Sequence, residues 1–171
     1  PVKMGLHWVG DLMVEMDVLV ESPNGDLVLE LIEGGRKFRC TINLTTGDAA
    51  LSAAGDDGYA PTAKTPITKP SEYHVAFANF DDQLRLWVDD DLVKFNDTTA
   101  YDAKKVFGDR RVLRPKTSDD DPGDFAPVRI AARDAKRDIR LIEQRGQSAD
   151  HPILASMPET RYLKCFIVQV L

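Results

Sequence analysis

The chain has 171 residues, with 22 Lys and Arg against 28 Asp and Glu, so its formal net charge is −6 at neutral pH. This balance argues against a protein that binds nucleic-acid phosphates or anionic membranes, because both need a surplus of positive charge. No apolar run approaches the roughly 20 residues that cross a bilayer, so we expect a soluble single domain over residues 1–171. The first residue is Pro1 rather than Met, which favours a processed chain or a segment excised from a longer one.

Three stretches in the first third of the chain have the two-residue period of half-buried strands. The first runs over residues 12–20, where Leu12, Val14, Met16, Val18 and Val20 alternate with Met13, Glu15, Asp17 and Leu19. Turn-forming residues at 22–26 separate it from residues 27–33, and Gly34 and Gly35 separate those from residues 38–44. The last two stretches therefore predict an antiparallel hairpin.

The middle of the chain predicts a loop followed by a meander. Residues 53–70 are rich in Gly, Pro, Asp and Thr and have no apolar face, which is typical of a loop. Residues 73–78 and 84–88 alternate in polarity around a turn at 79–82, and three aspartates then lead into a third short strand at 92–95. Consecutive short strands of this kind are the usual material of a β-sandwich.

The remainder is less regular. Residues 96–124 predict a long loop, residues 127–132 a strand, and residues 145–171 a C-terminal extension with a final strand from Tyr162. Residues 133–144 fit either a helix or a strand, and we favour a strand because the rest of the chain is β. The predicted fold is thus all-β, a two-sheet antiparallel β-sandwich of jelly-roll type with few or no helices. The core candidates are Trp8, Phe38, Phe77, Leu86 and Trp87.

The two cysteines, Cys40 and Cys165, are too few for a disulfide framework and too far apart for a metal knuckle. Each lies in phase with neighbouring apolar residues. We expect two free buried thiols, with one long-range bridge as the alternative.

Aspartates recur at the predicted turns, and Asp81, Asp82, Asp89 and Asp90 are the candidate metal ligands. Calcium needs several converging oxygen ligands, which turns at one end of a sandwich can supply. The alternative is that these are solvated turn residues, and no stretch has EF-hand spacing. The three histidines are scattered and suggest no zinc site. We therefore expect no cofactor, with calcium as the single alternative.

No catalytic residue is predicted. A nucleophile elbow and a phosphate-binding glycine loop are both missing, and Lys164 lies on the outward phase of its strand, away from a role as base for Ser156. The acidic residues Glu15, Asp17, Glu30 and Glu33 have no context that marks a glycosidase pair. Basic residues at 36–39, 110–116 and 129–145 are interleaved with acids, which favours a salt-bridged surface over nucleic-acid binding.

The segment 73–89 resembles the central hairpin of concanavalin-like and laminin-G-like jelly rolls, with its Leu-Arg-Leu-Trp-Val-Asp strand at residues 84–89. The resemblance implies a fold that hosts lectins, glycosidases and scaffolds alike. In a lectin, an exposed aromatic ring stacks on sugar. The candidate ligand-binding residues are accordingly Trp8, His74, Asn79 and Trp87.

A closer resemblance covers roughly residues 7–142. It rests on His-Trp-Val-Gly-Asp-Leu at 7–12, Gly-Gly-Arg-Lys-Phe-Arg-Cys at 34–40, Phe-Ala-Asn-Phe-Asp-Asp at 77–82 and Leu-Trp-Val-Asp at 86–89. These motifs resemble the β-domain inserted in planctomycete-type signal peptidase I proteins. The family's Ser-Met-x-Pro box is missing here, so no catalytic role carries over.

The resemblance implies a non-catalytic accessory domain of a membrane-anchored serine/lysine protease that cleaves signal peptides at the outer face of the cytoplasmic membrane. The implied partner is a protein or peptide. The alternative function is a lectin-like module, calcium-assisted or not, whose partner is a glycan.

Overall fold

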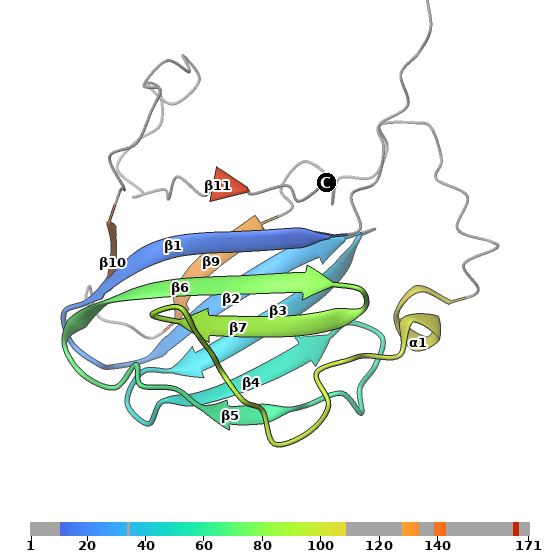
Figure 1. Cartoon of the computed structure of the whole chain (residues 1–171), viewed down its shortest axis with the longest axis horizontal. Coiled ribbons are helices and arrows are strands. Elements are labelled where there is room, and N and C mark those ends of the chain that lie inside the picture. Colours follow the sequence, from blue (N-terminus) through green and yellow to red (C-terminus); the bar gives the residue numbers. More distant parts are fainter. Residues whose placement is uncertain (1–10, 34, 109–127, 134–138, 143–165, 168–171) are drawn as a thin grey trace, which may run out of the picture.

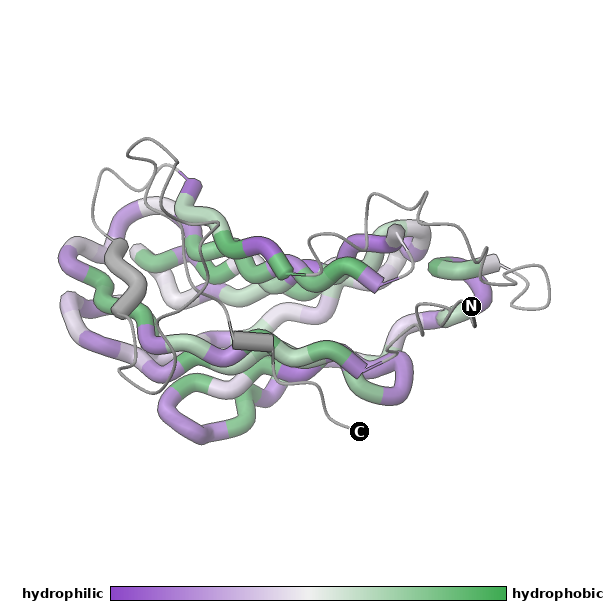
Figure 2. The backbone as a smooth tube through the Cα atoms, turned by 90° about the horizontal axis from the view of Figure 1, so that it is seen from above, coloured by the Kyte–Doolittle hydropathy of each residue, from purple (hydrophilic) through white to green (hydrophobic). Residues whose placement is uncertain are grey.

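The computed structural model of the chain describes residues 11–33, 35–108, 128–133, 139–142 and 166–167. Two antiparallel sheets lie face to face (Figures 1 and 2). The predicted all-β fold class, a two-sheet antiparallel sandwich of jelly-roll type with few helices, is confirmed.

Sheet A has the strand order β10-β1-β6-β7-β8, and β11 also pairs with β1. Sheet B has the order β5-β4-β3-β2-β9. The strands of sheet A are β1 (Leu12–Val20), β6 (Ser71–Phe80), β7 (Gln83–Val88), β8 (Asp91–Leu92), β10 (Ile139–Ile142) and β11 (Phe166–Ile167). Those of sheet B are β2 (Asp26–Glu33), β3 (Arg36–Asn43), β4 (Asp48–Ala53), β5 (Thr62–Lys64) and β9 (Val128–Arg133).

The core follows from the two-residue period of the sequence. In β1, β3, β4, β6 and β7, alternate residues face the opposite sheet and most of them are buried, while the residues between them face outward. Met16 is only half-buried, and Arg36 and Ser71, at the starts of β3 and β6, are exposed. Phe38, Phe77 and Leu86 are completely buried, which confirms three of the predicted core residues. Trp87 is half-buried on the outer phase of β7 instead, and Trp8 lies outside the described residues.

An aromatic group closes one end of the sandwich. Tyr101 packs on Phe38 with ring centroids 4.8 Å apart, and Phe107 lies 6.0 Å from Phe38. Tyr59 meets Tyr101 edge-on, and its hydroxyl donates a hydrogen bond to the carbonyl oxygen of Thr99 at 2.6 Å. These contacts hold residues 99–107, which follow strand β8 and contain no strand of their own, against the core.

Three elements differ from the sequence prediction. The strand predicted at 92–95 is the two-residue strand β8 at Asp91–Leu92, and residues 93–95 are not in a strand. Residues 53–70, predicted as loop, include the three-residue edge strand β5, which is too short to show a period. Residues 96–124, predicted as loop, include helix α1 (Ala103–Phe107). Asp102 caps this helix by accepting the Lys104 backbone N–H at 2.9 Å, and Val106 and Phe107 bury its apolar side.

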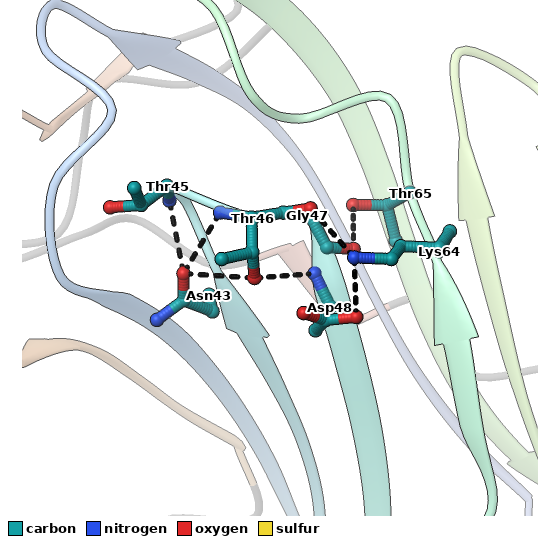
Figure 3. Close-up of polar contacts among 7 residues, drawn as sticks. All are labelled: Asn43, Thr45, Thr46, Gly47, Asp48, Lys64 and Thr65. Carbon is teal, nitrogen blue, oxygen red and sulfur yellow. Dashed lines mark hydrogen bonds and ion pairs between the residues drawn. The ribbon is translucent and has the colours of Figure 1, made fainter.

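The β3–β4 turn is held by a dense set of polar contacts (Figure 3). Asn43 Oδ1 accepts from the backbone N–H of Thr45 at 3.1 Å and of Thr46 at 3.0 Å. Gly47 has a φ of +74°, and its carbonyl accepts from the backbone N–H of Thr65 at 2.8 Å. The turn thus ties β3 and β4 to the segment that follows β5.

Of the two cysteines expected to be free buried thiols, Cys40 is a free thiol buried in the core, and burial raises its pKa. Cys165 lies outside the described residues. Among the residues that the structure describes, no helix has the length and hydropathy needed to cross a membrane.

Candidate functional site

His74 and Trp87 share the outer face of sheet A. His74 lies on β6 and Trp87 on the neighbouring β7, where Trp87 pairs with Ala76. Because Ala76 is two residues from His74, the two side chains are diagonal neighbours, with Cα atoms about 7–8 Å apart. Figure 1 shows β6 between β1 and β7, so the outward side chains of β1 belong to the same surface.

The imidazole of His74 lies between two carboxylates of β1. Its Nδ1 is 2.7 Å from Asp17 Oδ1, and its Nε2 is 2.9 Å from Glu15 Oε1. Asp17 is the direct register partner of His74, and Glu15 is two residues away on the same face. The hydrogen bond to Asp17, reinforced by Glu15 and opposed by partial burial, raises the pKa of His74. We call Glu15, Asp17 and His74 the imidazole triad.

An apolar strip lies beside this triad. It consists of Ala76, Trp87 and Leu92, which the register aligns across β6, β7 and β8. Glu15 of the triad is the partner of Ala76 on β1 and continues the same line. Trp87 is half-buried, and Leu92 is 53% exposed, the most exposed large apolar side chain among the described residues. Neighbouring strands lie about 4.8 Å apart, so Glu15 and Trp87 are about 10 Å apart at their Cα atoms. The surface therefore combines an aromatic ring with charged hydrogen-bonding groups at close range.

Asn79, the third described ligand candidate, is placed elsewhere. It lies on the inward phase of β6 and is 1% exposed. Its Nδ2 donates to Glu33 Oε2 at 2.7 Å and to the Tyr101 hydroxyl at 3.1 Å, while its Oδ1 has no hydrogen-bond partner. Asn79 is thus part of the interior at the end of the sandwich and is not brought together with His74 and Trp87. The fourth candidate, Trp8, lies outside the described residues.

The four aspartates predicted as metal ligands form two tight turns. Asp81 and Asp82 join β6 to β7, and Asp89 and Asp90 join β7 to β8, all with φ between 51° and 67°. Two consecutive left-handed residues are typical of a type I′ hairpin turn, for which Asp is well suited. Since the six residues of β7 separate the pairs, they lie about 20 Å apart and do not converge.

Asp89 also has a local structural role. Its Oδ1 accepts the backbone N–H of His74 at 2.8 Å, and its own N–H donates to the His74 carbonyl at 2.7 Å. This side chain therefore extends the β6–β7 ladder and fixes the backbone of His74. Within the described ranges, no group of three or more His, Cys, Asp and Glu side chains has the arrangement of a metal centre.

Glu15 and Asp17 are the site residues that sequence reasoning did not assign to ligand binding. Their alternation along β1 placed them on the outer face, and the same period placed His74 outward on β6. The pairing of β1 with β6 could not be predicted from the local sequence. His74 is 57 residues from Asp17 and 59 residues from Glu15 along the chain.

No family model matches the chain. Short stretches match curated ribosomal RNA large subunit methyltransferase I proteins. The match is 56% identical over 44 residues in Cronobacter sakazakii, covering 26% of this chain and 11% of that protein. It is 54% identical over 41 residues in Escherichia coli O1:K1, covering 24% and 10%. The chain thus spans about a tenth of the length of these curated relatives.

Two solved structures are similar in fold. The carbohydrate-binding module CBM66 from Bacillus subtilis aligns with a TM-score of 0.41 and 19% identity, over 57% of this chain and 62% of that one. Sheep galectin-11, in complex with glycerol, aligns with a TM-score of 0.43 and 16% identity, over 59% and 80%. At these values, function has to be argued from the residues of the chain itself.

Proposed function

We propose that the chain is a non-catalytic, lectin-like module that binds a glycan on the outer face of sheet A. The observation that carries this proposal is the half-buried Trp87 beside the imidazole triad. A sugar ring has apolar C–H faces and a rim of hydroxyl groups. An indole ring offers a flat apolar surface to the C–H faces, and carboxylates accept hydrogen bonds from the hydroxyl groups.

The triad is suited to recognition because it is pre-ordered. His74 holds Asp17 and Glu15 in place, and the side chain of Glu15 remains 42% exposed, so it is available to a ligand. When the side chains of a site are already fixed, the protein loses less conformational entropy on binding a ligand. The backbone of His74 is itself fixed by Asp89.

A binding role fits this geometry better than glycoside hydrolysis. A glycosidase sets two carboxyl groups on opposite sides of the scissile bond, one as acid and one as base or nucleophile. Here Glu15 and Asp17 project from one strand and hydrogen bond the same imidazole. The two carboxylates thus share one imidazole as their hydrogen-bond partner.

A glycan array tests the proposal, with the wild-type chain compared with Trp87→Ala and Leu92→Ala. We expect binding by the wild type, loss in Trp87→Ala and a weaker effect in Leu92→Ala, which lies at the edge of the strip. The array is run with calcium and with a chelator. Silence of the wild type in both conditions would refute the proposal, and strict calcium dependence would move the site to the aspartate turns.

The second candidate is an accessory domain of a signal-peptidase-related protease, and its support is the motif resemblance over residues 7–142. In that case a protein or peptide would be the partner, and the domain would work at the outer face of the cytoplasmic membrane. Its test is the mass and fractionation of the endogenous product, captured with an antibody and mapped by peptides. A membrane-bound product with a serine/lysine protease signature supports it, and a soluble product of the present length rules it out.

A further inference from the structure

The outer face of sheet B, on the opposite side of the sandwich, is rich in arginine. β9 contributes Arg129 and Arg133, and β3 contributes Lys37 and Arg39. Strand β2, which lies between β3 and β9, supplies the acids Asp26 and Glu30. Four cations against two carboxylates give this area a local excess of two positive charges in a chain whose net charge is −6. We call Lys37, Arg39, Arg129 and Arg133 the arginine face.

Glu30 organises the centre of the arginine face. Its register partners are Arg39 on one side and Arg129 on the other. Arg39 Nε donates to Glu30 Oε2, and Arg129 Nη1 lies 3.7 Å from Glu30 Oε1. The Glu30 side chain is only 6% exposed, whereas those of Arg39 and Arg129 are 43% and 53% exposed. A buried carboxylate therefore draws two guanidinium groups toward one point and leaves much of each facing solvent.

The chemistry of this arrangement suits a second carboxylate. Each guanidinium carries five N–H donors in a planar fork that matches the geometry of a carboxylate. One contact to Glu30 uses a small part of that capacity. Thr41 and Ser52 lie on the same face beside Arg39 and provide hydroxyl groups for a hydrated ligand.

The same face lacks features that nucleic acids use. Single-stranded nucleic acid binds through aromatic side chains on which bases stack. Among the described residues, the outward positions of β2, β3, β4, β5 and β9 include no aromatic side chain. A positively charged face without aromatic side chains favours an anionic polysaccharide over a single-stranded nucleic acid as its ligand.

We propose that the arginine face binds an acidic polysaccharide whose charges are uronate carboxylates, with Arg39 and Arg129 as a carboxylate clamp set by Glu30. This site is separate from the glycan site of the proposed function and does not depend on it. Arg133 lies four residues beyond Arg129, about 13 Å along β9, and extends the contact along a linear polymer.

The test uses polygalacturonate and its fully methyl-esterified form, which has the same backbone without the charges. We expect the wild-type chain to bind the first and not the second. Arg129→Gln and Arg133→Gln are each expected to weaken binding about tenfold, because each removes charge-assisted hydrogen bonds. Both side chains are exposed, so folding is preserved, whereas a change at Arg39 would leave the buried Glu30 without its main partner.

The control is the double variant Lys69→Gln with Lys94→Gln, which removes two exposed positive charges that lie outside the strands of sheet B. An equal loss in this variant, equal binding of the methyl ester, or tighter binding of heparin or polyphosphate than of polygalacturonate would overturn the proposal. Trp87→Ala should retain polygalacturonate binding, so failure of the proposed function is distinguished from failure of this site.

Discussion

The Nδ1 atom of His74 lies 2.7 Å from Oδ1 of Asp17, although 57 residues separate them in the chain. The pairing of β1 with β6 creates this contact, since the two residues are direct partners in the register. The outer face of sheet A thereby acquires a histidine that is protonated more readily than a free one.

The first prediction is a pH-dependent loss of stability. The folded-state pKa of His74 is raised above its ordinary value of 6.5, chiefly by Asp17. The stabilisation is therefore fully present below about pH 6.5 and is lost as the pH rises through the raised pKa. The difference in free energy of unfolding between wild type and His74→Gln should shrink from pH 6 to pH 9 in denaturant titrations. A difference that stays constant across this range would show that the pKa of His74 is not raised by its contact with Asp17.

The second prediction compares two glycines with nearly equal φ. Gly47 and Gly108 have φ of +74° and +72°, values that L side chains rarely adopt, and Gly108 also has a ψ of −155°. Backbone strain alone should therefore make alanine cost about 1–3 kcal/mol at either position. At Gly47 an added Cβ would lie 2.5 Å from the Thr65 carbonyl oxygen, whereas at Gly108 nothing lies within 4 Å. Gly47→Ala should therefore be more destabilising than Gly108→Ala by about 1–3 kcal/mol in chemical unfolding. Equal losses of stability would show that the β3–β4 turn accommodates a Cβ at Gly47 without a clash.

The third prediction concerns Asn79 at the closed end of the sandwich. Asn79→Ala removes the hydrogen bonds to Glu33 and Tyr101 from a site that is 1% exposed, and should cost about 1–3 kcal/mol. Gln83→Ala, which removes a hydrogen bond to Thr99 in a more exposed position, should cost less than about 1 kcal/mol. Thermal and denaturant unfolding measure both. An Asn79→Ala variant as stable as wild type would mean that the amide is dispensable there.

Much of the fold was predictable because strands with one buried face have a strict two-residue period. This period identified β1, the β2–β3 hairpin and the β6–β7 hairpin. Strand β5 and helix α1 are three and five residues long, too short to show one. Their positions depend instead on contacts with distant segments, such as Lys105 with Asp56 at 3.0 Å.

The site was predictable only in part. Outward phase placed His74 on the surface of its strand, and the structure has it on the outer face of sheet A. Trp87 was predicted both as a core residue and as a ligand candidate, and it lies half-buried on the same outer face. Asn79 was predicted within the turn at 79–82, yet β6 continues to Phe80, and the same alternation that buries Phe77 directs Asn79 inward. The imidazole triad depends on the β1–β6 pairing, and the arginine face on the β2–β9 pairing, neither of which follows from local sequence.

The most direct test of the central claim is an NMR titration with the glycan bound most tightly on the array, following the Trp87 indole and the His74 imidazole. The Trp87→Ala and His74→Gln variants assign the two signals. We predict that both signals shift on binding, while the Arg129 and Arg133 side-chain signals on the opposite face stay in place. Shifts confined to the arginines, or to the aspartate turns, would contradict a glycan site on the outer face of sheet A.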